Sequence, residues 1–395
     1  MFYTDYMIKR EIELKLKELS KQYPIITITG PRQSGKTTLV KKVFKDRYYV
    51  NLEHPEERDF AMDDPQGFLN RMPDGGIIDE IQRVPKLLSY IQVVSDEKNI
   101  SGLFILTGSN QFKLMNSITQ SLAGRTALLK LLPFSLTELN NIYNKNSTNV
   151  DHILYNGFYP RLYDKGLEPY QMYSDYFETY VERDIRQILK VKNINQFKKF
   201  IKLLAGRIGQ LLNLSSISND LGISHTTIRE WTDILQTSYI VFLLEPFYKN
   251  IKKRLIKTPK IYFYDVGLAS FLLGMEDVKH VSNHPLRGNL FENLVIADIL
   301  KNRFNNAKKN NLNFYRDNSG NEVDLIYNIS QKVRAIEIKS SETINNIFFK
   351  GLTNFEKTFP EIVENKIVIY GGSRTETRKG ISISNIYDMK KIIEK

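Results

Sequence analysis

The residues with the clearest chemical potential lie in one short segment that holds two glycines and a Lys-Thr pair. The segment reads Gly30, Pro31, Arg32, Gln33, Ser34, Gly35, Lys36, Thr37 and Thr38. Gly30 and Gly35 carry no Cβ, so the backbone can wrap closely around a phosphate. Lys36 is placed to reach β- and γ-phosphates, and Thr37 offers a hydroxyl ligand for Mg²⁺. The segment matches the G-x-x-x-x-G-K-T P-loop and predicts a nucleotide site to which all nine residues contribute.

The neighbouring segments supply the two elements that such a turn must connect. Ile25–Thr29 reads IITIT, which predicts a short buried strand. Thr38–Val43 follows the turn and predicts a helix, whose N-terminus would face the phosphates. A glycine-rich turn that binds nothing is the alternative, and the complete motif in this context favours the nucleotide site.

Two carboxylates end another predicted strand further along the chain. Gly75–Glu80 reads GGIIDE, an apolar run that delivers Asp79 and Glu80 at its carboxyl end. Ligands of open α/β sheets bind at the carboxyl ends of the strands. Asp79 would therefore hold the Mg²⁺ shell, and Glu80 would polarise the attacking water. An acidic loop is the alternative, which the preceding P-loop disfavours.

A polar turn follows the next predicted strand, Leu103–Thr107. It reads Thr107-Gly-Ser109, and either hydroxyl could sense the γ-phosphate or hold the water. A polar turn without a role in chemistry is an equally good interpretation. We expect Ser109 to be part of the nucleotide site.

These motifs, together with Leu122–Arg125 (LAGR), resemble the bacterial and archaeal AAA+ ATPases of this size, which are similar to the archaeal ATPases and to the STAND branch. The resemblance extends from about residue 20 to about residue 345. It implies ATP and Mg²⁺ as cofactors and catalytic roles for Lys36, Glu80 and Arg125. In such ATPases the arginine lies near its own or a neighbour's nucleotide and offsets transition-state charge. A surface arginine at the start of a strand is the alternative.

A second group of charged residues lies in the C-terminal part of the sequence. Glu292 is in a predicted helix, Asp324 in a strand, and Glu337 and Lys339 in the next strand. Residues two apart in a strand share a face, so Glu337 and Lys339 point the same way. The order resembles the PD-(D/E)xK nuclease core, in which the three carboxylates would bind Mg²⁺ or Mn²⁺ and Lys339 would act on a water or the phosphate. A charged sheet face, or a nuclease-like domain that does not cleave, is the alternative.

The sequence between these two regions is typical of a winged helix-turn-helix. Leu214–Leu221 and His225–Leu235 predict helices, with Gly222 in the turn and Ser224 as the N-cap. The outward-facing residues of the second helix, where a DNA reader needs them, would be His225, Thr226, Thr227 and Arg229. The segment from Lys249 to Lys260 holds six basic residues and could bind a phosphate backbone. Protein packing and a solvated connector are the alternatives.

The composition limits the class of protein. The 395 residues, 42% of them apolar, suffice for two or three domains, and the net charge of +12 favours nucleic acid as a partner. There is no cysteine, which excludes disulfides and thiolate metal sites. No apolar run approaches the ~18 residues of a membrane span, and Met1–Tyr6 lacks the apolar part of a signal peptide, so we expect a cytoplasmic protein without a membrane partner. His280 and His284 are followed by Pro285, and we expect no zinc.

We therefore predict an α/β protein with four parts. These are an AAA+ P-loop ATPase core (1–140), a helical lid (141–195), a winged helix-turn-helix (196–260) and a PD-(D/E)xK nuclease-like domain (261–395). ATP hydrolysis with Mg²⁺ would control how the later modules act on DNA, in a chain that could form a homo-oligomer. Two alternatives stay open: a STAND-like switch or assembly protein that does not cleave, and an ATP-controlled defence or toxin-type nuclease.

Overall fold

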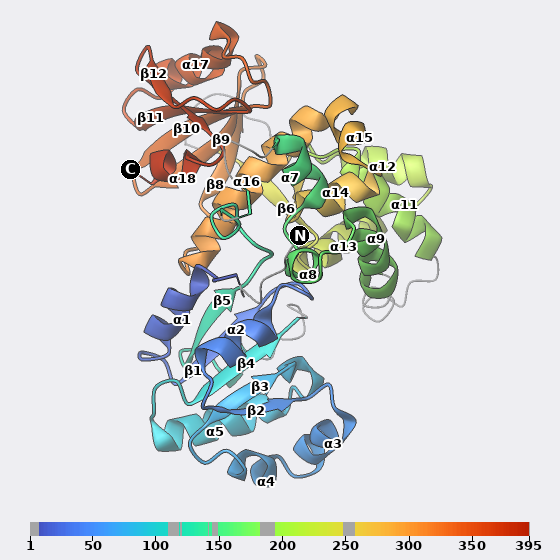
Figure 1. Ribbon diagram of the computed structural model, residues 1–395, viewed down its shortest axis with the longest axis vertical. Helices are drawn as coiled ribbons and strands as arrows, with labels where there is room; N and C mark the ends of the chain where they lie inside the picture. Colours follow the sequence, from blue (N-terminus) through green and yellow to red (C-terminus); the bar gives the residue numbers. More distant parts are fainter. Residues whose placement is uncertain are drawn as a thin grey trace. The chain divides into compact units, whose positions relative to one another are not determined.

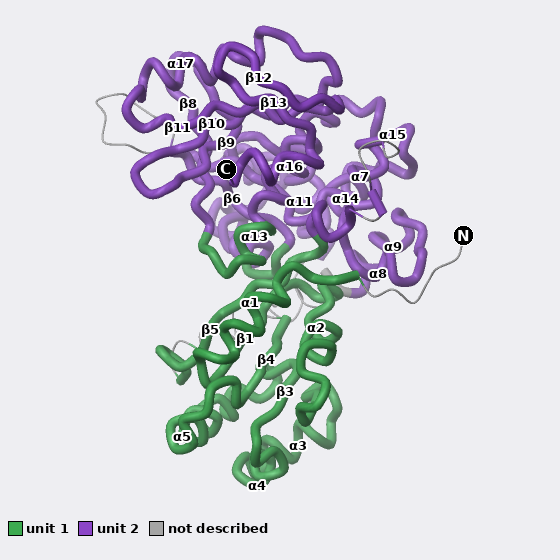
Figure 2. Tube along the Cα trace, turned by 60° about the vertical axis from the view of Figure 1, so that its left-hand side comes forward, with its two compact units in different colours: residues 1–134, 237–239, 301–309 green, residues 135–236, 240–300, 310–395 purple. Residues whose placement is uncertain are grey.

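The chain folds into two compact units, which Figure 2 shows in different colours. The computed structural model describes residues 8–109, 118, 121–140, 142–143, 149–181, 194–247 and 257–394. Unit 1 comprises residues 1–134, 237–239 and 301–309, and unit 2 comprises residues 135–236, 240–300 and 310–395.

Unit 1 is built on a five-stranded sheet in which every pair of neighbouring strands is parallel (Figure 1). The strand order is β2-β3-β4-β1-β5. Its elements are α1 (Ile12–Leu19), β1 (Ile25–Thr29), α2 (Lys36–Val43), β2 (Tyr48–Asn51), α3 (Pro55–Asp63), α4 (Pro65–Asn70), β3 (Gly76–Asp79), the 3₁₀ turn η1 (Ile81–Arg83), α5 (Leu87–Lys98), β4 (Phe104–Gly108) and β5 (Thr126–Lys130). The predicted strands are confirmed, and their parallel order brings the carboxyl ends of β1, β3 and β4 to one edge.

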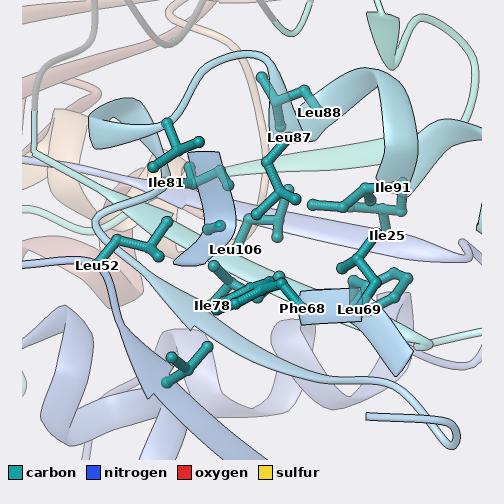
Figure 3. Packing of buried hydrophobic residues seen from close by; sticks show 14 of the residues in the cluster. Ile25, Leu52, Phe68, Leu69, Ile78, Ile81, Leu87, Leu88, Ile91 and Leu106 are labelled. Carbon is teal, nitrogen blue, oxygen red and sulfur yellow. The ribbon is translucent and has the colours of Figure 1, made fainter. Parts of the chain in front are cut away.

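The sheet of unit 1 is buried on both faces, as its apolar strands require. On one face Ile26 and Ile28 pack with side chains of α1 and α2. On the other face Ile25 and Ile78 pack with Phe68 of α4 and with the leucines of α5, as Figure 3 shows. All five residues of β1 are buried, which holds the start of the P-loop rigidly.

The charged segment of residues 54–64 in unit 1 is mostly helical. Pro55–Asp63 forms helix α3. Pro55 occupies the first helical position, and Glu56 and Glu57 lie in the first turn, where a carboxylate is stabilised by the helix dipole. The charges therefore mark a helix start and not a loop.

Unit 2 contains an eight-stranded mixed sheet with the order β12-β13-β11-β10-β9-β8-β6-β7. Its helices and turns are α7 (Val150–Asn156), α8 (Pro160–Lys165), α9 (Pro169–Tyr176), the π-helix η2 (Phe177–Val181), α11 (Ile194–Ala205), α12 (Leu214–Leu221), α13 (His225–Thr237), α14 (Val266–Leu272), α15 (Val278–Asn283), α16 (Arg287–Asn305), the 3₁₀ turn η3 (Asn346–Phe349), α17 (Lys350–Thr358) and α18 (Met389–Ile393). Thr237 at the end of α13 and residues 301–305 at the end of α16 belong to unit 1. Its strands are β6 (Val241–Pro246), β7 (Lys260–Phe263), β8 (Leu312–Arg316), β9 (Glu322–Ile329), β10 (Lys332–Lys339), β11 (Val363–Tyr370), β12 (Glu376–Arg378) and β13 (Ile381–Asn385).

The C-terminal part of that sheet mixes two kinds of strand pairing. β10 is antiparallel to β9 on one side and parallel to β11 on the other. Helix α17 packs on it through Leu352 and Phe355, which join a cluster with Val333 and Ala335 of β10. Within the described residues, we find no helix long and apolar enough to cross a membrane.

Candidate functional site

The P-loop lies between β1 and α2, and two of its residues must be glycine. Gly35 has a φ of 89°, in the left-handed region that other residues resist. A Cβ on Gly30 would lie 2.0 Å from the backbone oxygen of Leu131. Buried Ser34 donates its hydroxyl to the carbonyl of Pro31 at 2.9 Å, which closes the turn on itself. The loop is therefore a preformed turn.

The other predicted loop residues differ in exposure. Arg32 is half-buried, whereas Gln33 and Thr38 are exposed. Arg10 also contacts the loop through its buried guanidinium, a role that was not predicted from the sequence. It donates to the backbone oxygens of Ser34 at 2.8 Å and Leu132 at 2.7 Å, so the loop is tied to the strand region beside β1.

Lys36 begins α2 and is buried beneath the loop. Its ammonium donates to the carbonyl oxygens of Gly30 at 3.0 Å and Pro31 at 2.7 Å. Burial lowers the pKa of Lys36 to about 8, although Glu80 and Asp79 act in the opposite direction. A phosphate bound at the loop would add negative charge beside Lys36 and would stabilise its protonated form.

Thr37 and Asp79 form the part of the site that suits a metal. Thr37 Oγ1 donates to Asp79 Oδ2 at 2.7 Å, Tyr49 donates its hydroxyl to the same oxygen at 2.9 Å, and Thr107 donates to the other carboxylate oxygen. Hydroxyl and carboxylate oxygens are the hard ligands that Mg²⁺ prefers. The donor set therefore fits Mg²⁺, with Thr37 and Asp79 as the residues that would hold it.

Glu80 is the centre of a small polar network at the end of β3. It has a φ of 57°, a conformation rare outside glycine and often found at functional sites. Ser109 Oγ donates to Glu80 Oε2 at 3.0 Å, and the amide of Gln82 donates both to that oxygen and to Ser109 Oγ, the latter at 3.3 Å. The Gln82 oxygen is buried without a hydrogen-bond partner among the described residues. The network orients the carboxylate that was predicted to polarise water.

Tyr49 and Gln82 were not predicted from the sequence. Tyr49 lies on β2, the strand paired with β3, so only the sheet register brings it to Asp79. Gln82 follows Glu80 by two residues, and a polar residue so close to a strand-end carboxylate is the one local signal available. Neither residue belongs to the P-loop pattern.

Arg125 lies at the other edge of the same sheet. It precedes β5, which runs parallel to β1 with Thr126 opposite Ile25, whereas the P-loop follows Thr29. The length of β1 separates Arg125 from its own P-loop by roughly 15 Å. Its guanidinium forms a bidentate ion pair with Asp96 of α5 at 2.6 and 2.8 Å. This geometry excludes contact with its own nucleotide and leaves a neighbour's nucleotide or a structural role.

The second predicted group comes together in unit 2, at the end of β10. Lys339 Nζ lies 2.6 Å from Glu337 Oε1 and 3.1 Å from Asp324 Oδ2. Asp324 also accepts the backbone N–H of Ile338 at 2.8 Å, which fixes its carboxylate against β10. Burial and the charge of Asp324 raise the pKa of Glu337 to about 8. Although burial opposes it, the two carboxylates raise the pKa of Lys339.

Glu292 is held by different partners from those predicted. It lies 3.2 Å from the ammonium of Lys260 and accepts a hydrogen bond from Tyr262 at 2.5 Å. Lys260 also lies 2.6 Å from Glu322 and is only 3% exposed. Despite its burial, Lys260 has a raised pKa because carboxylates surround it. Lys260 is therefore a buried ion-pair partner, which corrects its assignment to an exposed basic segment.

The predicted metal-binding residues are held mainly by lysine side chains. No group of three or more metal-ligating His, Asp or Glu side chains with suitable geometry is present in the part of the chain that the structure describes. Lys339 stands between Asp324 and Glu337, and Lys260 holds Glu292. One oxygen, Glu337 Oε2, is buried with no described hydrogen-bond partner. These side chains form a buried charge network, and the metal site stays a prediction.

The predicted helix-turn-helix elements are present as α12 and α13. Gly222 has a φ of 63° between them, and Ser224 Oγ accepts the backbone N–H of Thr227 at 3.1 Å. Trp231 is buried, while His225 and Arg229 are exposed. β6 and β7 follow as an antiparallel pair. The basic residues Lys249, Lys252, Lys253 and Arg254 lie outside the described residues.

Three family models match separate parts of the chain. Residues 22–140 match a model described as "AAA domain". Residues 147–279 and 287–389 match models described as domains of unknown function, DUF8612 and DUF4143. The first match agrees with the P-loop and the strand-end carboxylates, and it supports a nucleotide-binding domain of the AAA ATPase type in this part of the chain. The prediction of an AAA-type ATPase is supported to this extent, and the winged-helix and nuclease-like assignments stay predictions.

The sequence similarity to known proteins covers more of the chain than the AAA domain. An uncharacterized protein of Mycobacterium tuberculosis is 28% identical over 338 residues, which cover 85% of this chain and 74% of the relative. An uncharacterized protein of Haemophilus influenzae is 26% identical over 336 residues, 75% of this chain and 79% of the relative. The solved Walker-type ATPase of Pyrococcus abyssi has 16% identity and a TM-score of 0.44, and the match covers 67% of this chain and 96% of that chain.

Proposed function

We propose that this protein hydrolyses ATP with Mg²⁺ and that the nucleotide state controls how unit 2 acts on DNA. The observation that carries the ATPase proposal is the Thr37–Asp79 hydrogen bond of 2.7 Å beside Glu80. It supports a site in which a metal ligand pair and a candidate general base lie at the same sheet edge as Lys36.

The residues have separate tasks in this reaction. Bound Mg²⁺ would offset charge on the β- and γ-phosphate oxygens. Lys36 exchanges its two carbonyl contacts for the phosphates, whose charge favours its protonated form. Glu80, held by Ser109 and Gln82, accepts a proton from the attacking water at its carboxylate. Arg125 contributes only if it belongs to a neighbouring subunit.

Phosphate release from ATP tests this proposal directly. The wild type should release phosphate in the presence of Mg²⁺, whereas Lys36→Ala should lose both binding and release. A suitable control is Glu97→Gln, which removes the charge of an exposed carboxylate on α5 and should leave release unchanged. Release that persists in Lys36→Ala at the wild-type rate would refute the assignment.

The DNA role is supported by three separate observations. The formal charge of +12 favours an anionic partner, α13 exposes His225 and Arg229, and the Asp324–Glu337–Lys339 group lies at the end of β10. The ion pairs of Lys260 and Lys339 occupy the carboxylates, which favours a domain that binds DNA without cleaving it over a nuclease. Such a domain corresponds to the STAND-like alternative. A defence or toxin-type nuclease under ATP control is the other candidate.

Cleavage assays distinguish these roles. Plasmid and linear DNA would be incubated with Mg²⁺ or Mn²⁺, with and without ATP, using the wild type, Asp324→Ala and Lys36→Ala. Cleavage that is lost in Asp324→Ala assigns a nuclease, and a further dependence on Lys36 shows control by ATP. Absence of cleavage together with intact ATP hydrolysis favours the switch.

A further inference from the structure

Unit 2 has a cavity of about 580 Å³ whose lining does not include Asp324, Glu337 or Lys339. Its lining follows the carboxyl ends of β10, β11 and β13, three strands that run parallel. Gly371, in the lining, donates its N–H to the backbone oxygen of Lys339 at 3.0 Å, so the cavity adjoins the strand that carries Glu337. Carboxyl ends of parallel strands are the usual ligand position in α/β sheets, and the volume is that of a small-molecule site.

One positively and one negatively charged side chain in the cavity lining have no partner among the described residues. Arg374 and Arg378 both line it, and Arg378 forms an ion pair with Glu376 at 2.6 Å. Within the described residues, neither the guanidinium of Arg374 nor the carboxylate of Glu342 has a hydrogen-bond or ion-pair partner. A guanidinium is suited to bind a phosphate, and a carboxylate accepts hydrogen bonds from sugar hydroxyls.

The loop that carries Arg374 is held in place before any ligand binds. The N–H of Arg374 donates to the hydroxyl of Tyr370 at 2.8 Å, and the amide of Asn385 donates to the carbonyl of Ser373 at 3.0 Å. A Cβ on Gly372 would lie 2.3 Å from the ring of Tyr370, so this position needs glycine for close approach. A fixed loop reduces the ordering cost of binding.

We propose that this cavity binds a nucleotide. Arg374 binds its phosphate, Glu342 accepts hydrogen bonds from its sugar hydroxyls, and the ring of Tyr387 in the lining stacks on its base. Two kinds of ligand carry a phosphate, a sugar and a base in this arrangement: a free nucleoside monophosphate and the 5′-phosphorylated end of a nucleic-acid strand. The site is distinct from the P-loop, because every lining residue belongs to unit 2.

The test uses the full chain with Lys36→Ala as a common background, which removes binding at the P-loop. Calorimetric titrations would compare AMP, inorganic phosphate, and one ribo-oligonucleotide with and without a 5′-phosphate. Arg374→Gln should weaken binding of the phosphorylated probes by about tenfold or more, since it removes a charge-assisted contact. Glu342→Gln should weaken AMP and leave inorganic phosphate unchanged.

Lys357→Gln is the matched control, because Lys357 is an exposed cation on α17 outside the lining. It should leave affinity within about twofold, as expected for a distant, screened charge. Tighter binding of AMP assigns a free nucleotide, and tighter binding of the 5′-phosphorylated strand assigns a strand end. Equal loss in Arg374→Gln and Lys357→Gln, or no binding of any phosphorylated probe, overturns the proposal. Unchanged melting temperatures show that the exposed substitutions leave the fold intact.

Discussion

ATP affinity is expected to fall as the pH rises above about 8, because Lys36 loses its charge there. Burial beneath the P-loop lowers the pKa of this lysine from 10.5, and the carboxylates of Glu80 and Asp79 offset part of that effect. A bound phosphate adds negative charge beside the ammonium and raises the pKa again. Binding therefore requires the protonated lysine.

The size of the effect follows from the protonated fraction of the free protein. Below its pKa, Lys36 is already charged and the affinity is at its maximum. Above it, binding must take up a proton, so affinity falls tenfold per pH unit. The protonated fraction falls from about nine-tenths near pH 7 to about one-tenth near pH 9, and Kd should rise about tenfold, or ~1.4 kcal/mol.

Equilibrium titration with ATP in EDTA measures this change without a contribution from bound metal. Lys36→Met is the control, because its side chain is similar in length and carries no charge. It should bind weakly at every pH in the range and show no slope. A wild-type affinity that is flat across the range would refute the reasoning, as would a tenfold slope that persists in Lys36→Met.

Three further predictions concern residues whose contacts are known. Glu80→Gln should keep ATP binding but slow phosphate release by about 10²–10⁴-fold, because the amide cannot accept a proton from water. Tyr239→Phe removes a 2.8 Å hydrogen bond to the buried hydroxyl of Thr29 and should lower the free energy of unfolding, measured with denaturant, by about 1 kcal/mol. Lys260→Met leaves the carboxylates of Glu292 and Glu322 without their ammonium and should cost about 3–5 kcal/mol in the same assay.

Each of these outcomes has a clear contradiction. Wild-type phosphate release in Glu80→Gln would remove it as the general base. A stability of Lys260→Met equal to that of Lys357→Met, an exposed control on α17, would show that the buried ion pairs contribute nothing. A free energy of unfolding of Tyr239→Phe equal to that of the wild type would show that the hydrogen bond to Thr29 contributes nothing.

The sequence pattern was sufficient to predict a site or an element where the residues that form it lie in one short segment. The P-loop was identified because its glycines, Lys36 and Thr37 are adjacent and lie between a strand and a helix. Asp79 and Glu80 were found because they end an apolar strand. The helices α12 and α13 were found from apolar spacing, a cap at Ser224 and a glycine turn.

The partners of these residues were decided by pairing between distant parts of the chain. Tyr49 reaches Asp79 through the register of β2 with β3, and Tyr239 reaches Thr29 across 210 positions. The parallel pairing of β5 with β1 placed Arg125 at the edge opposite its own P-loop. Lys260 was predicted to be part of a basic surface, but it is buried and forms ion pairs. Sequence alone determined which residues can bind phosphate and metal, because those groups are neighbours in the chain. Tertiary structure alone decided which charges meet and which stay unpaired, because that depends on strand order, register and burial.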